Sequence, residues 1–262
     1  SLLNDVERDY DLAVEKRCDK IKDRDATEVC IFGNEGSTRS VLLWGDSHAM
    51  QYADALSEAA DILDIKLVVA TRSACPPMLL SEDEAERYFV FPSFGYQNRV
   101  GCIVRNNYIL KSDEYLKADL VLLVSAGFTS PKFQLLAQNA ANFKSKSTAI
   151  VQNPPNIINY PEKISSTVSN KQVQMLRMGI YYVDEEDVDL GTDFVTSARN
   201  ANGDLRYIKT VDNFCSEGKC YLAVGGIPVY RDTHLSGLYS KSLGPWFAKI
   251  LQNNFPLLKS AK

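Results

Sequence analysis

Short runs of consecutive apolar residues alternate along this chain with longer segments in which apolar residues recur every three or four positions. An uninterrupted apolar run is typical of a strand buried on both faces, and the wider spacing is typical of an amphipathic helix. The runs predict strands at residues 40–44, 65–70, 120–124, 148–152 and 180–183. The helical spacing predicts helices at residues 49–63, 133–143, 171–178 and 235–253.

Turn-forming residues interrupt this pattern. Residues 71–112 contain adjacent prolines and an acidic patch, and we expect them to be irregular. Asn202-Gly203 predicts a hairpin between strands at residues 193–199 and 205–209. Pro245 lies inside the last predicted helix, so we expect either a kink there or a helix that begins later.

Strands that alternate with helices indicate a parallel sheet covered by helices on both faces, which makes this an α/β protein. Such sheets bind ligands at the carboxyl ends of their strands. Ser47 follows the first predicted strand, residues 71–75 follow the second and residues 125–127 follow the third, so these segments are expected to meet at one edge. We expect residues 40–262 to form one domain, preceded by an N-terminal extension over residues 1–39.

The composition is that of an ordinary globular protein, with 45% hydrophobic and 24% charged residues. A formal net charge of -4 argues against a nucleic-acid partner, because such proteins usually carry a basic surface. No apolar run reaches about eighteen residues, so no segment is expected to span a membrane. The first residues lack the features of a signal peptide, and we expect the chain to be a domain of a longer protein. Residues 184–189 are acidic but lack the spacing of a calcium loop, and no metal site is expected.

The six cysteines of the chain fall into pairs that are local in sequence. None has the spacing of a zinc site, and only two histidines are available to complete one. Pairing of nearest neighbours closes short loops, so we predict the disulfides Cys18–Cys30, Cys75–Cys102 and Cys215–Cys220, and with them an oxidising compartment. The alternative is a cytosolic protein whose six cysteines are buried and reduced.

The segment Gly45-Asp46-Ser47-His48 directly follows the first predicted strand and is the best candidate for chemistry. A serine becomes a nucleophile when an imidazole accepts its proton, and that imidazole needs a carboxylate or carbonyl to orient it. Of the two histidines, His234 has Asp232 two residues before it, whereas His48 adjoins the serine and is expected to point elsewhere. We therefore interpret Ser47 as the nucleophile, His234 as the general base and Asp232 as its orienting acid. The alternatives are a serine that caps a helix and a structural histidine.

A set of motifs carries a resemblance to a known family. The motifs are Leu43-Trp44-Gly45-Asp46-Ser47-His48-Ala49, Ser73-Ala74-Cys75-Pro76-Pro77 and Tyr230-Arg231-Asp232-Thr233-His234-Leu235-Ser236. The chain resembles the SGNH (GDSL-type) hydrolase superfamily, roughly from Cys18 to Phe255. Within it, the chain resembles the SGNH domains fused behind an acyltransferase-3 membrane domain in bacterial O-antigen and related surface-polysaccharide O-acetyltransferases. The resemblance implies a three-layer α/β/α fold with a parallel sheet, and it implies the same catalytic roles for Ser47, His234 and Asp232.

The site of this chain departs from the superfamily pattern in two respects. Many members place the orienting aspartate three residues before the histidine, where this chain has Arg231. The asparagine block that usually follows the third strand is also missing, since Ser125-Ala126-Gly127-Phe128 stands there. We therefore expect backbone N–H groups of Ser47, of the Ser73 turn and near Gly127 to form the oxyanion hole.

The resemblance implies an O-acetyltransferase domain that moves an acetyl group onto a hydroxyl of a bacterial surface polysaccharide, such as the lipopolysaccharide O-antigen. It implies no cofactor bound by this domain, because the fused membrane domain supplies an acetyl group that comes ultimately from acetyl-CoA. The expected partners are that upstream acyltransferase-3 domain and the polysaccharide acceptor, and the expected location is the periplasmic side of a bacterial inner membrane. Arg72 is a candidate contact for an acidic sugar, with a solvated arginine as the alternative. The alternative functions are a carbohydrate acetyl esterase and a non-catalytic glycan-binding module.

Overall fold

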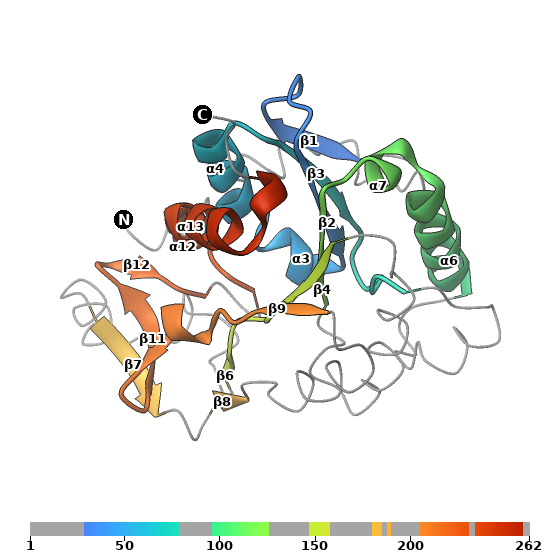
Figure 1. Cartoon of the computed structure of the whole chain (residues 1–262). Coiled ribbons are helices and arrows are strands. Elements are labelled where there is room, and N and C mark those ends of the chain that lie inside the picture. Colours follow the sequence, from blue (N-terminus) through green and yellow to red (C-terminus); the bar gives the residue numbers. More distant parts are fainter. Residues whose placement is uncertain are drawn as a thin grey trace.

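A six-stranded sheet with the order β1-β3-β2-β4-β5-β9 forms the centre of the protein (Figure 1). The computed structural model describes residues 29–78, 96–125, 147–157, 180–184, 188–189, 205–230 and 234–258, and the fold is given for these. The strands of the sheet are β1 (Cys30–Gly33), β2 (Ser40–Gly45), β3 (Lys66–Thr71), β4 (Leu120–Val124), β5 (Thr148–Val151) and β9 (Arg206–Ile208). Neighbouring strands pair in parallel, except that β1 is antiparallel to β3.

The central strands are buried on both faces. Every residue of β2, β4 and β5 is buried, which explains why their sequences are uninterrupted apolar runs. Successive side chains of a strand point to opposite faces. In β2, Val41 and Leu43 therefore join one hydrophobic core, and Leu42 and Trp44 join the other.

Helices cover both faces, and the layers are those of the expected three-layer α/β/α fold (Figure 1). One face carries α3 (Ser47–Met50), α4 (Ala53–Leu63), α12 (Gly237–Ser242) and α13 (Gly244–Asn254). The other face carries α6 (Tyr96–Lys111) and α7 (Asp113–Leu116). Leu56 of α4 and Phe247 of α13 are buried in the first core, and Ile109 of α6 and Tyr115 of α7 are buried in the second. The α/β prediction is confirmed. Among the helices of the described residues, none is long and apolar enough to cross a membrane.

A smaller antiparallel sheet lies below α12 and α13 in the view of Figure 1. It contains β10 (Cys215–Ser216), β11 (Lys219–Val224), β12 (Ile227–Pro228) and β7 (Ile180–Asp184). Leu222 of β11 shares the first core with Tyr239 of α12, so the two sheets are joined through common packing. Shorter elements lie outside these two sheets. β6 (Asn156–Ile157) pairs with β8 (Val188–Asp189), and η4 (Val211–Asn213) and η5 (Pro256–Leu258) are 3-10 helices.

Disulfides join neighbouring elements. Cys75–Cys102 links the turn after β3 to α6, and Cys215–Cys220 links paired positions of β10 and β11. Cys30 of β1 is also disulfide-bonded, but its expected partner Cys18 lies outside the described residues. No cysteine in the described part of the chain is free.

Two predicted helices are divided in the structure. The helix expected at residues 49–63 is interrupted between α3 and α4, where the carbonyl of Gln51 accepts a hydrogen bond from Ser240 Oγ (2.5 Å). The helix expected at residues 235–253 is divided between α12 and α13, and Pro245 lies in the first turn of α13. α13 therefore begins later than the predicted helix, and its proline lies in the first turn, where proline is favoured. The helices predicted at residues 133–143 and 171–178, and the strand predicted at 193–199, lie outside the described residues.

The irregular structure expected for residues 71–112 is wrong, because they include the sixteen-residue helix α6. The strand expected at residues 205–209 exists as β9, but it pairs in parallel with β5 at the edge of the main sheet. β1 was not predicted, and it places residues 30–33 in this sheet. The division at residue 39 stays a prediction.

Candidate active site

The turn that carries Ser47 begins at the end of the central strand β2. At Gly45, an added Cβ would lie 1.8 Å from the carbonyl oxygen of Val124 in β4, so only glycine fits. Asp46 then caps α3, because its Oδ1 accepts a hydrogen bond from the N–H of His48 (2.8 Å). Ser47 is thereby the first residue of α3, at the carboxyl edge of the parallel sheet.

Ser47 and His234 meet at this edge. His234 Nε2 lies 3.0 Å from Ser47 Oγ, and both residues are partly exposed. His234 comes from the segment just before α12, where Leu235 forms an antiparallel bridge with Tyr230. At this distance the imidazole can accept the hydroxyl proton of Ser47, as nucleophilic catalysis requires.

The second histidine adjoins the first. The rings of His48 and His234 have centroids 4.8 Å apart and are tilted by 48°. His48 Nδ1 lies 3.4 Å from Nε2 of Gln51. His48 is thus directed toward Gln51 and the ring of His234.

Two predicted site residues lie outside the described residues. These are Asp232, the expected orienting acid, and Gly127, an expected contributor to the oxyanion hole. Their roles stay predictions.

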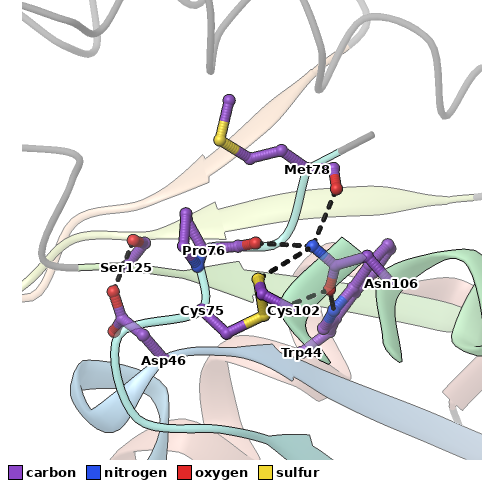
Figure 2. The surroundings of a disulfide bond; sticks show 8 residues. All are labelled: Trp44, Asp46, Cys75, Pro76, Met78, Cys102, Asn106 and Ser125. Carbon is purple, nitrogen blue, oxygen red and sulfur yellow. Dashed lines mark hydrogen bonds between the residues drawn. A yellow bond between two sulfur atoms is a disulfide. The ribbon is translucent and has the colours of Figure 1, made fainter. Parts of the chain in front are cut away.

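Buried polar residues that follow the neighbouring strands β4 and β5 support the turn that carries Ser47. Ser125 follows β4, and its Oγ donates to Asp46 Oδ2 (2.6 Å). Asn153 follows β5, and its Nδ2 donates to the carbonyl of Ser125 (2.6 Å). All three residues are buried, and Figure 2 shows Asp46 and Ser125 facing each other. Polar groups that follow three adjacent strands are therefore connected to Asp46, the residue directly before Ser47.

The turn after β3 also reaches this edge. Arg72 N donates to the carbonyl of Gly45 (3.0 Å), which places Ser73 next to the start of the nucleophile turn. Ser73 is exposed, and Ala74 has a positive φ of 56°. The guanidinium of Arg72 lies against α6, because a Cβ added at Gly101 would be 2.4 Å from its Nη2. A role for Arg72 in substrate binding stays a prediction.

Asn106 of α6 joins this turn to β2 (Figure 2). Its Oδ1 accepts from Trp44 Nε1 (3.0 Å), and its Nδ2 donates to the carbonyls of Pro76 (2.8 Å) and Met78 (2.7 Å). The Cys75–Cys102 disulfide lies beside these bonds. One buried amide and one covalent link therefore hold the turn that contains Ser73 against the second face of the sheet.

Gln51, Ser125, Asn153 and Asn106 were not predicted as site residues from the sequence. The available signal was a polar residue directly after an apolar strand, which describes Ser125 and approximately Asn153. Among the residues that the structure describes, no group of three or more His, Cys, Asp or Glu could hold a metal ion.

Comparison with known proteins identifies a matching family and a solved structure. The model of the family described as an SGNH domain fused to AT3 domains matches residues 17–249. Comparison with curated proteins gave no match. The chain is similar to the structure of the periplasmic domain of a lipopolysaccharide acetyltransferase from Salmonella ser. Paratyphi A, with 16% sequence identity and a TM-score of 0.58. That match covers 84% of this chain and 85% of the other, and at this identity it shows a shared fold.

Proposed function

This chain belongs to the family of SGNH domains fused to AT3 domains, and we propose that it transfers acetyl groups to a hydroxyl of a bacterial surface polysaccharide. The observation that carries the proposal is the 3.0 Å approach of His234 Nε2 to Ser47 Oγ at the carboxyl edge of the sheet. The similar Salmonella structure, described as a lipopolysaccharide acetyltransferase domain, supports a polysaccharide such as the O-antigen as the acceptor.

In the proposed reaction, His234 accepts the proton of Ser47 as Ser47 Oγ attacks the acetyl carbonyl of the donor. The donor's leaving group takes this proton from His234, and the acetyl group stays on Ser47. The sugar hydroxyl then loses its proton to His234 and attacks the acetyl carbonyl, which forms the sugar ester. His234 returns the proton to Ser47 Oγ, and Asp232 orients the imidazole throughout.

The proposed oxyanion hole consists of backbone N–H groups of Ser47, the Ser73 turn and Gly127. Its support is the hydrogen bond from Arg72 N to the carbonyl of Gly45, since this bond brings the Ser73 turn beside Ser47. Removal of a donor of this kind can lower kcat on the order of a hundredfold, so its position affects the rate strongly.

The acetyl group needs a route to Ser47. We propose that this domain binds no cofactor and lies in the periplasm, as part of a bacterial inner-membrane protein. The AT3 domain to which the family is fused would pass the acetyl group across the membrane, from cytoplasmic acetyl-CoA to this site.

Labelling with a fluorophosphonate tests the nucleophile. We expect the wild-type chain to be labelled, and we expect Ser47→Ala to lose both labelling and acetyl transfer, by at least on the order of a thousandfold. Ser216→Ala, which changes an exposed serine of β10, is the matched control and should be labelled normally. Labelling that persists in Ser47→Ala would remove the serine from the mechanism.

The direction of acetyl transfer needs a second measurement, in the full-length protein with its membrane domain. Unacetylated polysaccharide should gain acetyl groups when acetyl-CoA is supplied, and Ser47→Ala should abolish this gain. Loss of acetyl groups from acetylated polysaccharide, with no gain in the first assay, would identify an esterase instead. Glycan binding without turnover of any ester would identify a binding module.

A further inference from the structure

Gln51 connects the elements that carry the two reacting side chains. It lies between α3 and α4 and is only 8% exposed. Its Oε1 accepts from the N–H of Leu235 (3.0 Å), the residue directly after His234. Its own carbonyl accepts from Ser240 Oγ of α12 (2.5 Å). The helix that begins with Ser47 is therefore bonded through one residue to the segment that carries His234.

These bonds fix the orientation of the Gln51 amide. The backbone N–H of Leu235 can only donate, so the amide atom that faces it must be the oxygen. The amide NH₂ group therefore faces Nδ1 of His48, at 3.4 Å. An NH₂ group can only donate, so His48 Nδ1 must accept, and the proton of the neutral ring must lie on Nε2.

This tautomer matters because His48 adjoins the proposed base. Acylation and deacylation both place a positive charge on His234, whose ring centroid is 4.8 Å from that of His48. A second positive charge on His48 would oppose the first. The Gln51 amide disfavours such a charge, because a proton on His48 Nδ1 would face the NH₂ group of Gln51 donor to donor. Asp46 is a further titratable group bonded to His48, because its carboxyl accepts from the His48 backbone N–H (2.8 Å).

We propose that Gln51 is a positioning residue of the acyl-transfer site, which anchors the backbone beside His234 and holds His48 neutral with its proton on Nε2. This inference rests on the proposed function for its kinetic consequence. The tautomer itself is a property of the resting chain and can be measured without any turnover.

NMR of the histidine ring nitrogens tests the tautomer directly. The chain has only two histidines, so isotope labelling of histidine gives two ring systems, and His48→Asn assigns them. At about pH 8.5, above the usual histidine range, the wild-type chain should show His48 with a bare Nδ1 and a protonated Nε2. In Gln51→Glu, a carboxylate oxygen faces the ring, and Nδ1 should become protonated. A protonated Nδ1 in the wild-type chain overturns the proposal, even if Gln51→Glu fails to fold.

Kinetics test the effect on His234. Gln51→Glu keeps an acceptor for Leu235 N but favours a charged His48. The kcat of acyl transfer should therefore fall by at least on the order of tenfold, with little change in the KM of that reaction. Gln252→Glu makes the same substitution on the exposed side of α13 and should leave kcat unchanged. Adding His48→Asn to Gln51→Glu removes the charge and should restore most of the lost rate.

A double variant as slow as Gln51→Glu would show that Gln51 does not act through His48, and it would overturn the kinetic half of the proposal. These failures differ from failure of the proposed function. If the proposed function is wrong, the wild-type chain itself shows no acyl transfer, and the ring proton of His48 is still found on Nε2 by NMR.

Discussion

Gly45 fits its place at the start of the nucleophile turn only because it has no side chain. It ends β2, and an added Cβ would meet the carbonyl oxygen of Val124 at 1.8 Å and the Cβ of Ala49 at 2.8 Å. Both neighbours belong to the buried core or its backbone, so neither can move without shifting β4 or α3.

We expect Gly45→Ala to lower the free energy of unfolding by about 3 kcal/mol, the upper end of the usual cost of overpacking. Urea unfolding of the purified chain measures it. Gly36→Ala is the matched control, because the nearest atom to its added Cβ is Asn34 Oδ1 at 3.4 Å and the residue is exposed. Its effect should stay within about 0.5 kcal/mol. Equal losses in the two variants would contradict the steric argument.

At the scale of single residues, the contact between Ser47 and His234 could be predicted from the sequence, because the chain has only two histidines and the other one adjoins the serine. It did not indicate the bond between Ser125 and Asp46, since that contact exists only because β4 lies beside β2. Gln51 was missed for a similar reason. Its partners Leu235 and Ser240 are distant in sequence, and no local pattern marks a glutamine that bridges them.

At the scale of elements, the disulfides restrain loops of different length. Cys75–Cys102 spans a sequence separation of 27 and ties the turn after β3 to α6, whereas Cys215–Cys220 spans 5 within a hairpin. The entropy of the unfolded chain falls more when a longer loop is closed. Loop-closure estimates give about 3.5 kcal/mol for the first bridge and about 2 kcal/mol for the second.

Cys75→Ala/Cys102→Ala should therefore destabilise the chain by about 1.5 kcal/mol more than Cys215→Ala/Cys220→Ala, in paired urea titrations under identical conditions. All four cysteines are buried, so the loss of packing is similar in the two double variants. The first variant should also lower the rate of acyl transfer, because it loosens the turn that contains Ser73. A normal rate in the first variant would show that the bonds of Asn106 and the bond from Arg72 N to the Gly45 carbonyl hold that turn without the disulfide.

The elements that were predicted well and poorly differ in how they are buried. β2 and β4 are covered on both faces, so their apolar runs identified them. α6 lacks a regular apolar stripe, because Arg105 and Asn106 are buried while Val104 and Tyr108 are exposed. β1 was missed because it is a short edge strand with only one covered face: Cys30 and Phe32 are buried on that face, and Ile31 is exposed on the other.

At the scale of the whole molecule, buried tyrosines join the helical layer to distant parts of the chain. Tyr52 precedes α4, and its hydroxyl donates to the carbonyl of Gln152 after β5 (2.8 Å). Complete burial raises the pKa of Tyr52 far above its ordinary value, and a hydrogen bond with Thr210 opposes this only in part. Burial also raises the pKa of Tyr239 in α12 to about 12, and its hydroxyl donates to the carbonyl of Asn213 (2.5 Å).

These shifts predict how stability changes in alkali. Above pH 10.0, the ordinary tyrosine pKa, the unfolded chain releases these two protons while the folded chain keeps them. The unfolded state then binds fewer protons, so the free energy of unfolding falls as the pH rises. Below pH 10.0 neither tyrosine makes stability depend on pH, and the effect of Tyr239 stops growing at about pH 12.

Tyr52→Phe removes one of the two released protons. Its free energy of unfolding should fall less steeply than that of the wild-type chain above pH 10.0, by about 1.4 kcal/mol per pH unit. Near neutral pH the same variant should be less stable by about 0.5–1.5 kcal/mol, because the hydrogen bond to the Gln152 carbonyl is lost while Thr210 Oγ1 still donates to that carbonyl (3.1 Å). Urea unfolding at a series of pH values separates the two effects, with Tyr108→Phe on the exposed side of α6 as the control. Because a lost hydrogen bond lowers stability equally at every pH, parallel curves for Tyr52→Phe and the wild-type chain would mean that Tyr52 ionises in the folded chain as readily as in the unfolded one.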